Sequence, residues 1–424
     1  MTKQKKEWTK NRIGRKFILI GFILFPITCA FYIVSINSND LIRTWMEFPL
    51  LLTAVFSLLL FITGIVFVRQ DKHREGKKLR KYVKVLIAIV ATIYFSGAVI
   101  VTSLLYIPSI GFKDWLITTA MTTMTHQKFA TWFYNDYTIE LVQSNNLVIE
   151  SGEDSNPDLI DFVEPDFNAT TYSSKYEKEI LTKDEGNDLY KIIDIDRDGY
   201  KGKLAVIYDA SKVKIANSKG VGTTLGNSYG QYLETISKDN KAVIGMNGGG
   251  FYDPNWNSTG GVPHGIVITN GKLIANNSKA LGVGGVIGFN KDNKLVLARL
   301  TAQQALNAGI RDCVDFGPFL IVNGEASFVK GNGGWGLAPR SAIAQRQDGI
   351  VLFLVIDGRQ VGSIGADMNH LVDVLLDYGA YNAANLDGGT SSVMTHNGKI
   401  ITKPRNGSFQ AKDRPIPNAW IVVE

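Results

Sequence analysis

Three long apolar runs near the N-terminus constrain the fold of this chain more than any other feature. They cover residues 17–34, 48–68 and 85–107. Each run has about the length that an α-helix needs to cross a hydrocarbon core of ~30 Å. The sequence therefore predicts three transmembrane α-helices, and residues 1–107 are expected to form a three-span anchor.

Basic residues are unevenly distributed around these runs. Residues 1–16 carry seven and residues 69–84 carry eight, whereas residues 35–47 carry only Arg43. Because Lys and Arg collect on the cytoplasmic side, the N-terminus and the second connection are expected in the cytoplasm. Everything after Ile107 would then lie outside the cell. This predicts a multi-pass cell-membrane protein with an extracellular C-terminal domain and membrane lipid as a partner.

The basic character of the chain belongs to its N-terminal part. Residues 1–107 carry 16 Lys and Arg against 5 Asp and Glu, and the remainder carries 29 against 34. No basic stripe interleaved with aromatic residues runs through that remainder, so nucleic acid is not expected as a partner. Cys29 and Cys313 are the only cysteines and fall in different parts. No intramolecular disulfide is expected, and the C-terminal domain must rely on its hydrophobic core.

The pattern changes twice after residue 107. Residues 108–175 combine an aromatic-rich segment, expected to be a juxtamembrane helix, with a polar stretch expected to be a tether. In residues 176–424, short β-branched and aromatic runs are bounded by Gly, Asn and Asp. This pattern predicts an α+β domain with a strand-rich mixed sheet and a few helices. The expected strands are 204–208, 242–246, 265–269, 286–289, 294–298, 318–322, 341–344 and 350–356, and the expected helices are 301–308 and 368–378.

Short turn signals connect several of these strands. Asn270-Gly271 and Asn323-Gly324 are typical of two-residue hairpin turns. Residues 194–199 begin like a calcium-binding loop, but the position that should close the loop is Ala205 rather than Glu. A β-turn is therefore the better interpretation of that segment.

Residues 385–392 concentrate polar chemistry on one short turn after an apolar strand. Their sequence is Asn-Leu-Asp-Gly-Gly-Thr-Ser-Ser, which supplies an amide, a carboxylate, two glycines and three hydroxyls. Glycine N–H groups can converge on an anion without obstruction by a Cβ atom, and hydroxyls can donate to its oxygens. Asp387 can move a proton. The turn predicts an anion site that contains a carboxylate.

Further polar clusters stand at the ends of other expected strands. Individually they are compatible with tight turns or surface ion pairs. The clusters are Met246–Asp253 with Gly260–Gly265, Asp315–Leu320, Ala338–Ala342 and Asp357–Arg359. In this order, and together with residues 385–392 and 414–423, they resemble the phosphodiester glycosidase family. An animal member of that family removes N-acetylglucosamine from a phosphodiester on lysosomal-enzyme glycans. The resemblance covers roughly residues 190–424.

The resemblance implies an enzyme that hydrolyses a sugar-1-phosphodiester, the bond between an anomeric carbon and an esterified phosphate. Combined with the expected location, it points to a cell-envelope glycopolymer, wall polymer or exopolysaccharide as substrate. Two alternatives stay open at this point. The chain could attack phosphorus as a phosphodiesterase or sugar-phosphate transferase, or it could bind a glycopolymer without turnover in exopolysaccharide biosynthesis.

Cleavage at an anomeric carbon needs a proton donor and a base or nucleophile. Asp387 and Asp357 are the first candidates because both follow apolar strands, where burial can separate their pKa values. His264 is a third candidate for proton transfer. The predicted substrate-binding residues are Asn247, Gly249, Asp253, Arg340, Ser341, Arg359, Asn385, Gly388, Gly389, Thr390 and Ser391. Among them, the two arginines suit a phosphodiester as bidentate clamps.

No spacing of His and Cys suits zinc, so no metal ligands are assigned. Carboxylates beside a phosphate leave room for Ca²⁺ or Mg²⁺. The expectation is that no cofactor is required, with a divalent cation as the open alternative.

Overall fold

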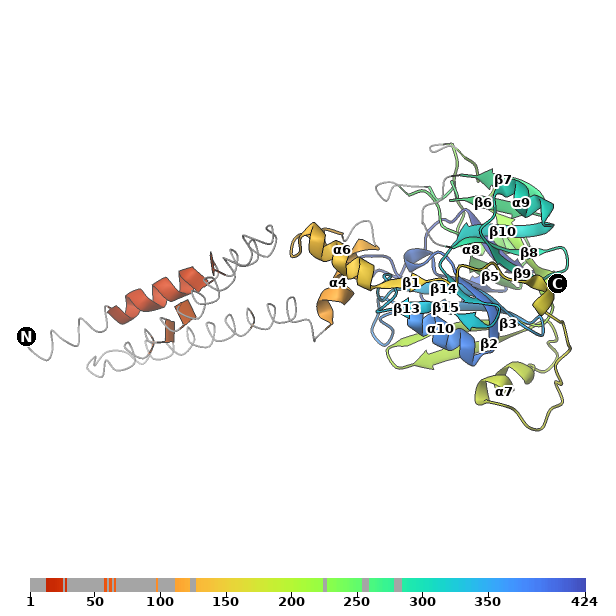
Figure 1. The fold of residues 1–424 in the computed structure, drawn as a ribbon, viewed down its shortest axis with the longest axis horizontal. Helices are drawn as coiled ribbons and strands as arrows, with labels where there is room; N and C mark the ends of the chain where they lie inside the picture. Colours follow the sequence, from red (N-terminus) through yellow and green to blue (C-terminus); the bar gives the residue numbers. More distant parts are fainter. Residues whose placement is uncertain are drawn as a thin grey trace, which may run out of the picture. The chain divides into compact units, whose positions relative to one another are not determined.

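The computed structural model describes most of the chain after residue 110 and short pieces before it (Figure 1). The described residues are 13–25, 27–28, 57–58, 61–62, 65, 97, 111–122, 127–223, 227–253, 259–277 and 284–424.

The prediction of three membrane-spanning helices needs correction. Among the described residues, no helix is long and apolar enough to cross a membrane. An apolar run of suitable length does not by itself fix the conformation of its residues. The rest of the three predicted ranges lies outside the described residues, and the multi-pass localisation that depended on these helices is corrected with them.

The chain divides into two compact units, residues 1–117 with 128–142 and residues 118–127 with 143–424. The aromatic-rich segment forms short helices rather than one juxtamembrane helix. They are α4 (Phe112–Met121), α5 (Gln127–Thr131) and α6 (Asp136–Asn145). The limits predicted for the domains stay predictions.

A seven-stranded antiparallel sheet forms the largest layer of the C-terminal domain. Its order is β12 (Glu325–Ala326), β11 (Phe319–Val322), β16 (Ala380–Asn385), β14 (Arg340–Arg346), β15 (Val351–Ile356), β3 (Tyr200–Ile207) and β2 (Tyr190–Arg197). Helix α10 (Met368–Asp377) contacts β16, β11 and β14 of this sheet, and its apolar residues, including Leu371 and Leu375, belong to the buried cluster there. Figure 1 shows α10 in the lower part of the domain.

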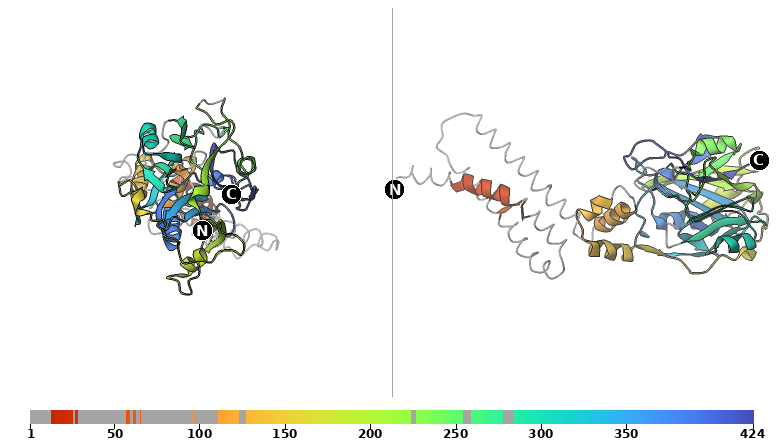
Figure 2. Two further views of the ribbon diagram at one scale, coloured as in Figure 1. Left: turned by 90° about the vertical axis from the view of Figure 1, so that its right-hand side faces the viewer. Right: turned by 90° about the horizontal axis from the view of Figure 1, so that it is seen from above.

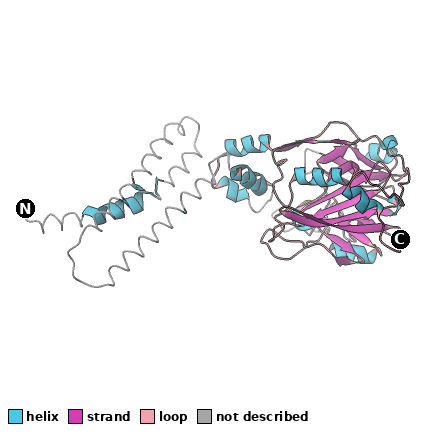
Figure 3. Cartoon of the chain, turned by 90° about the horizontal axis from the view of Figure 1, so that it is seen from below, coloured by secondary structure: helices cyan, strands magenta, loops and turns pink. Residues whose placement is uncertain are grey.

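Two five-stranded antiparallel sheets complete the core (Figures 2 and 3). One has the order β7 (Lys272–Asn276), β6 (Ile266–Thr269), β10 (Ile310–Phe316), β8 (Gly285–Asn290), β9 (Leu295–Ala298). The other has the order β18 (Lys399–Ile400), β17 (Met394–His396), β5 (Ile244–Asn247), β19 (Asn418–Val422), β4 (Val213–Asn217). Smaller elements are β1 (Leu147–Ile149) paired with β13 (Phe328–Lys330), α7 (Lys175–Leu181), α8 (Leu233–Asp239) and α9 (Ala302–Asn307).

One apolar core joins the three sheets. Phe353 of β15, Phe289 of β8 and Trp420 of β19 are buried in the same cluster. The rings of Phe289 and Trp420 meet edge to face, with their centroids 5.6 Å apart. Because each sheet contributes large side chains to this cluster, the ends of their strands are held in fixed relative positions.

The strand-rich α+β prediction for this domain is confirmed, together with its turns. Asn323 and Gly324 have φ angles of 53° and 84° and connect β11 to β12. Asn270 and Gly271 connect β6 to β7 in the same way, with φ angles of 50° and 70°. The calcium-like segment is the β2–β3 hairpin, and its Asp194 is paired with Lys203 across the two strands.

Part of the predicted tether, residues 143–175, is hydrogen-bonded to the sheets. The Glu150 carboxylate accepts the N–H of Phe319 at 2.6 Å. Ser155 exchanges two hydrogen bonds with Leu297, both of 2.8 Å, one through its main-chain N–H and one through its hydroxyl. This part of the polar segment is therefore attached to the domain rather than holding it at a distance.

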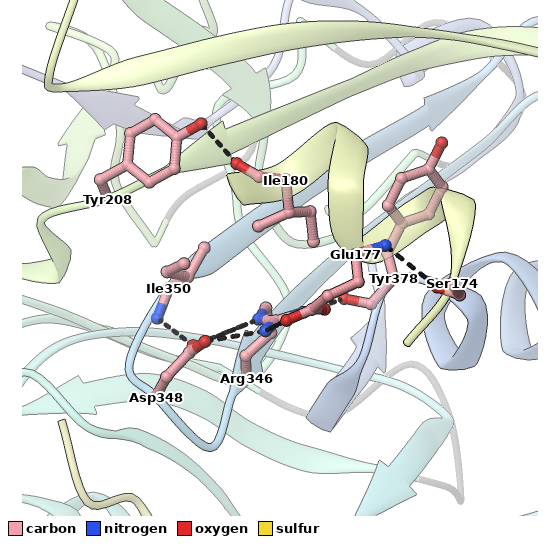
Figure 4. Close-up of polar contacts among 8 residues, drawn as sticks. All are labelled: Ser174, Glu177, Ile180, Tyr208, Arg346, Asp348, Ile350 and Tyr378. Atoms are coloured by element: carbon pink, nitrogen blue, oxygen red, sulfur yellow. Dashed lines mark hydrogen bonds and ion pairs between the residues drawn. The ribbon is translucent and has the colours of Figure 1, made fainter. Parts of the chain in front are cut away.

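Helix α7 is fixed by a buried charge cluster (Figure 4). The Arg346 guanidinium donates to Glu177 of α7 at 3.0 Å and to Asp348 at 2.8 Å, and also to the Tyr378 carbonyl at 3.1 Å. The Tyr208 hydroxyl donates to the Ile180 carbonyl at 2.8 Å. These contacts connect the helix to β14 and to the end of α10.

Candidate functional site

The side chain of Asn247 forms hydrogen bonds that connect the ends of three strands. Its amide Nδ2 donates to the main-chain oxygen of Asp387 at 2.7 Å, just after β16. Its Oδ1 accepts the Ser341 hydroxyl of β14 at 2.7 Å and the N–H of Val393 at 3.3 Å. Asn247 and Ser341, both predicted to bind substrate, are thus buried and hydrogen-bonded to each other. Their arrangement fixes the position of the 385–392 turn.

The three glycines after β5 let β19 approach closely. Gly248 N–H donates to the main-chain oxygen of Asn418 at 3.1 Å, and Gly249 N–H to its side-chain Oδ1 at 3.0 Å. A Cβ atom on Gly248 would lie 2.2 Å from that Oδ1, so only glycine fits. The Gly248 carbonyl accepts the N–H of Asp387 at 3.3 Å. The predicted residue Gly249 therefore serves a close backbone contact.

Asp387 lies at the centre of the turn and is half-buried. Burial raises the pKa of this carboxyl, and the nearby charge of Asp253 adds to the rise. The Gly388 N–H, which donates to Oδ1 at 3.0 Å, and the charge of Arg414 act in the opposite direction. Ser391 lies close enough to favour the ionised form, although its hydroxyl falls outside ordinary hydrogen-bond geometry. The balance of these effects raises the pKa of Asp387 above that of an ordinary carboxyl group.

Asp253 forms an ion pair with Arg414. Asp253 is buried, and the Arg414 guanidinium lies over the Phe251 ring at 4.4 Å from its centroid. Sequence reasoning did not select Arg414 as a single residue. Residues 414–423, which include Arg414, contributed to the family resemblance. That resemblance was the sequence signal that could have identified Arg414 as a residue of the site.

Arg340 is buried at the start of β14 and bonded to neutral groups. Its Nε donates to the Ala366 carbonyl at 3.1 Å, and its Nη2 donates to the carbonyls of Gly336, at 2.8 Å, and Trp335. Its Nη1 lies 3.3 Å from the position that a Cβ on Gly388 would occupy. Burial, together with a neighbouring arginine, lowers the pKa of Arg340 to about 10. The guanidinium remains charged at neutral pH and faces the glycine turn.

Arg359 is that neighbour, and it approaches the turn from the end of β15. It has a left-handed φ of 57°, uncommon for a residue other than glycine. Its Nη1 donates to the Arg405 carbonyl at 3.2 Å and the Thr390 hydroxyl at 3.4 Å. Its Nη2 lies 3.1 Å from the Cβ position of Gly389. Burial lowers the pKa of this arginine as well.

Neither arginine forms an ion pair within 4.0 Å among the residues that the structure describes. Arg340 is buried and Arg359 is half-buried. Two neighbouring cations repel each other, and burial of a charge without a counter-charge is costly. This pair of side chains at a glycine turn is therefore suited to bind an anion.

Unpartnered polar atoms gather around the same strand ends. Within the described part of the chain, buried side-chain atoms without a hydrogen-bond partner include Asn385 Oδ1, Ser391 Oγ, Ser392 Oγ and Asn418 Nδ2. Asn385 uses its Nδ2 to donate to the Gly317 carbonyl at 2.8 Å. Buried polar groups are normally satisfied, and their concentration here indicates a place where water or a ligand belongs.

Asp357 and His264, the other two candidates for proton transfer, contact residues outside the 385–392 turn. The Asp357 carboxylate accepts the N–H of Lys403 at 2.7 Å, and burial raises its pKa. His264 donates its main-chain N–H to Gly250 at 2.9 Å, and its ring lies edge to face with Tyr252, 6.2 Å between centroids. Asp357 therefore supports the loop at Lys403, and His264 lies beside the glycine run after β5.

No group of three or more His, Cys, Asp or Glu side chains that could hold a metal ion occurs among the described residues.

Residues 240–423 match the model of the phosphodiester glycosidase family. The match confirms the family predicted for the C-terminal domain, which contains the strand ends, the glycine turn and both arginines. Residues 240–423 thus match a family of glycosidase-type hydrolases, which is the enzyme class that the sequence predicts for the C-terminal domain.

A curated relative and two solved structures are similar to the chain. An uncharacterised SPbeta prophage-derived protein of Bacillus subtilis is 28% identical over 211 residues, covering 48% of this chain and 31% of that protein. The chain thus spans about a third of the length of that relative. The zebrafish N-acetylglucosamine-1-phosphodiester alpha-N-acetylglucosaminidase catalytic domain, auto-inhibited by its pro-peptide, is 22% identical, with a TM-score of 0.46 over 64% of this chain and 94% of that one. A putative exported protein of Burkholderia pseudomallei is 17% identical, with a TM-score of 0.38 over 53% of this chain and 74% of that one.

Proposed function

We propose that the chain hydrolyses a sugar-1-phosphodiester, with the phosphate held by Arg340 and Arg359 and the proton transfer carried out by Asp387. The observation that carries the proposal is a pair of guanidinium groups, Arg340 buried and Arg359 half-buried, that have no ion-pair partner among the described residues and are both directed at the 388–390 turn. A phosphodiester supplies the single negative charge that such a pair needs.

The proposed chemistry follows from the environment of Asp387. Hydrolysis breaks the bond between the anomeric carbon and the phosphate oxygen, and water supplies the new hydroxyl of the sugar. A carboxyl with a raised pKa holds its proton more readily and can exchange it with water or with the departing oxygen. The leaving phosphate monoester takes the bonding electron pair, and the two arginines stabilise the charge that develops on it. Asp357 and His264 remain further candidates for proton transfer.

The proposed mechanism requires no cofactor. The positive charge that a metal ion would supply to a phosphate is already present in two arginines. We therefore expect full activity after treatment with EDTA, and a rate that returns only on addition of Ca²⁺ or Mg²⁺ would contradict this part of the proposal.

A phosphate-containing glycan is the proposed substrate class, and a cell-envelope glycopolymer or an exopolysaccharide is its proposed natural form. The support for a glycan is the family match over residues 240–423. The polar atoms that lack partners around Asn385 and Ser392 add donors and acceptors for sugar hydroxyls.

The experiment is a turnover assay of the full-length chain on a panel of 4-nitrophenyl esters of sugar 1-phosphates. We expect release of free sugar and 4-nitrophenyl phosphate from at least one of them, and loss of this activity in Asp387→Asn. Arg197→Gln serves as the control, because Arg197 is paired with Asp377 and belongs to another part of the domain. Binding of sugar 1-phosphate with no turnover of any ester would favour a non-catalytic glycopolymer-binding protein.

A further inference from the structure

Glu150 connects strands that belong to two different sheets. Its Oε1 accepts the N–H of Phe319, the first residue of β11, at 2.6 Å and the N–H of Gly284, which precedes β8, at 3.0 Å. Its Oε2 is paired with Arg299, whose guanidinium carbon lies 5.3 Å from the centroid of the Phe319 ring. Only 9% of the Glu150 side chain is exposed. A carboxylate held in this way fixes the main chain that it contacts.

Residues 317–319, which lead from β10 into β11, connect Glu150 to Asn385. The Pro318 carbonyl accepts the main-chain N–H of Asn385 at 3.0 Å, and the Gly317 carbonyl accepts its side-chain Nδ2 at 2.8 Å. The next N–H along this segment is the one that Glu150 binds. Asn385 is therefore held at two points by a segment that Glu150 holds in turn.

These contacts leave one atom of Asn385 available to a ligand. The residue is only 1% exposed, and its Oδ1 has no hydrogen-bond partner among the described residues. A buried acceptor is costly unless water or a ligand donates a hydrogen bond to it. Sugar hydroxyls are such donors. Asn385 lies two residues before Asp387, so this acceptor belongs to the end of the strand that carries the proposed catalytic carboxyl.

We propose that Glu150 is a positioning residue: through residues 317–319 it fixes the Asn385 side chain so that Oδ1 accepts a hydrogen bond from a hydroxyl of the sugar. The inference rests on the proposed function for the identity of the ligand. Glu150 lies outside residues 240–423, which match the family. The site therefore depends on a part of the polar segment 143–175 that precedes the matched domain.

The first test compares two ligands of the full-length chain by titration calorimetry: inorganic phosphate, and the sugar 1-phosphate of the panel that the wild type binds most tightly. Glu150→Ala should weaken binding of the sugar 1-phosphate about 10-fold and leave binding of phosphate unchanged, because phosphate has no sugar hydroxyl for Asn385. Glu150→Gln keeps an acceptor oxygen and should weaken it about 3-fold, which decides the question if Glu150→Ala does not fold. Equal weakening for both ligands would overturn the proposal.

A double-mutant cycle tests whether Glu150 acts through Asn385. Asn385→Ala removes Oδ1 and should weaken binding of the sugar 1-phosphate about 10-fold. When Glu150→Ala is added to Asn385→Ala, the total loss should stay near 10-fold rather than reach about 100-fold, because the side chain that Glu150 positions is already absent. Losses that multiply would show that Glu150 acts independently of Asn385, and the proposal would fail.

Ser155→Ala is the matched control. Ser155 belongs to the same polar segment and is 7% exposed, and its hydroxyl accepts the N–H of Leu297 in β9 at 2.8 Å. The substitution therefore loosens the segment at β9 rather than at residues 317–319, and it should leave the affinity for both ligands unchanged. A loss as large as that in Glu150→Ala would show that the segment acts only by general stabilisation, against the proposal.

Hydrogen exchange of the ligand-free chain separates this inference from the proposed function. The N–H of Asn385, which is bonded to the Pro318 carbonyl, should exchange about 10-fold faster in Glu150→Ala than in wild type, and at the wild-type rate in Ser155→Ala. If no sugar 1-phosphate binds the wild type but this difference is present, the proposed function fails while the positioning of Asn385 by Glu150 stands. Equal exchange in Glu150→Ala and Ser155→Ala overturns the positioning.

Discussion

The side chain of Asn247 and the main chain of Asp387 are joined by a hydrogen bond of 2.7 Å between Nδ2 and the carbonyl oxygen. This contact links the last residue of β5 to the turn after β16, elements that belong to different sheets. The turn that carries the proposed catalytic carboxyl is therefore positioned by a buried amide of another sheet. The Asn247 side chain therefore fixes the position of the turn through a buried hydrogen bond.

Substitution of Asn247 by Ala should destabilise the domain and disorganise the turn. It leaves the Ser341 hydroxyl, the Val393 N–H and the Asp387 carbonyl without their partner. The expected loss is about 2–4 kcal/mol in the free energy of unfolding, measured by urea denaturation. Ser341→Ala, which removes one of these contacts, should cost about 1 kcal/mol. Equal losses for the two variants would contradict the central role of Asn247.

Asp387→Asn should abolish turnover and raise thermal stability. Because burial raises the pKa of Asp387, its protonated form is favoured in the folded state. The contribution of Asp387 to the stability of the folded state is therefore present below the ordinary pKa of a carboxyl group and is lost as pH rises through the raised pKa. The variant has no titrating group at this position, so its stability does not fall in this way. Melting temperatures measured from about pH 4 to about pH 8 should diverge in favour of the variant as pH rises. A wild type that is the more stable at high pH would contradict the cause assigned to the shift.

Arg359→Gln should weaken anion binding with little change in stability. The guanidinium has only neutral partners among the described residues and lies next to Arg340, so its removal relieves repulsion. We expect the inhibition constant of a sugar 1-phosphate to rise about 10- to 100-fold, measured by competition with the chromogenic ester. Arg197→Gln should leave that constant unchanged. An unaltered constant in Arg359→Gln would remove this residue from the proposed phosphate site.

Arg346→Ala should release the segment that contains α7. The substitution leaves the carboxylates of Glu177 and Asp348 without their buried cation. We expect a loss of about 3 kcal/mol in unfolding free energy, and earlier proteolysis near residues 165–190. The exposed pair Lys201–Asp196 offers a comparison, because Lys201→Gln should change stability by less than about 0.5 kcal/mol. Similar losses for the two variants would contradict the importance of burial.

Local patterns in the sequence were sufficient to predict the strands and turns of the C-terminal domain. The strand over 350–356 and the Asn323-Gly324 turn depend on neighbouring residues, and both are present in the structure. The three spans were predicted from apolar length alone, which does not determine whether a run forms one continuous helix. Among the residues that the structure describes, no helix is long and apolar enough to cross a membrane, and the expectation of three spans was wrong there.

The partners within the site could not be predicted from local patterns. Asp253 and Arg414 are 161 positions apart, and Gly249 and Asn418 are 169 apart. Their proximity is produced by the packing of β5 beside β19, which no single motif encodes. The pattern at 385–392 identified the turn itself. It gave no indication that Asn247 would hold this turn through its side chain.

The central claim is that water attacks the anomeric carbon of a sugar-1-phosphodiester in a reaction that depends on Asp387. It is tested most directly by turnover of the preferred 4-nitrophenyl ester in water enriched in heavy oxygen, followed by mass spectrometry of both products. The account predicts the label in the free sugar, unlabelled 4-nitrophenyl phosphate, and neither product with Asp387→Asn. Label in the phosphate would instead show attack at phosphorus, as in a phosphodiesterase, and would contradict the account.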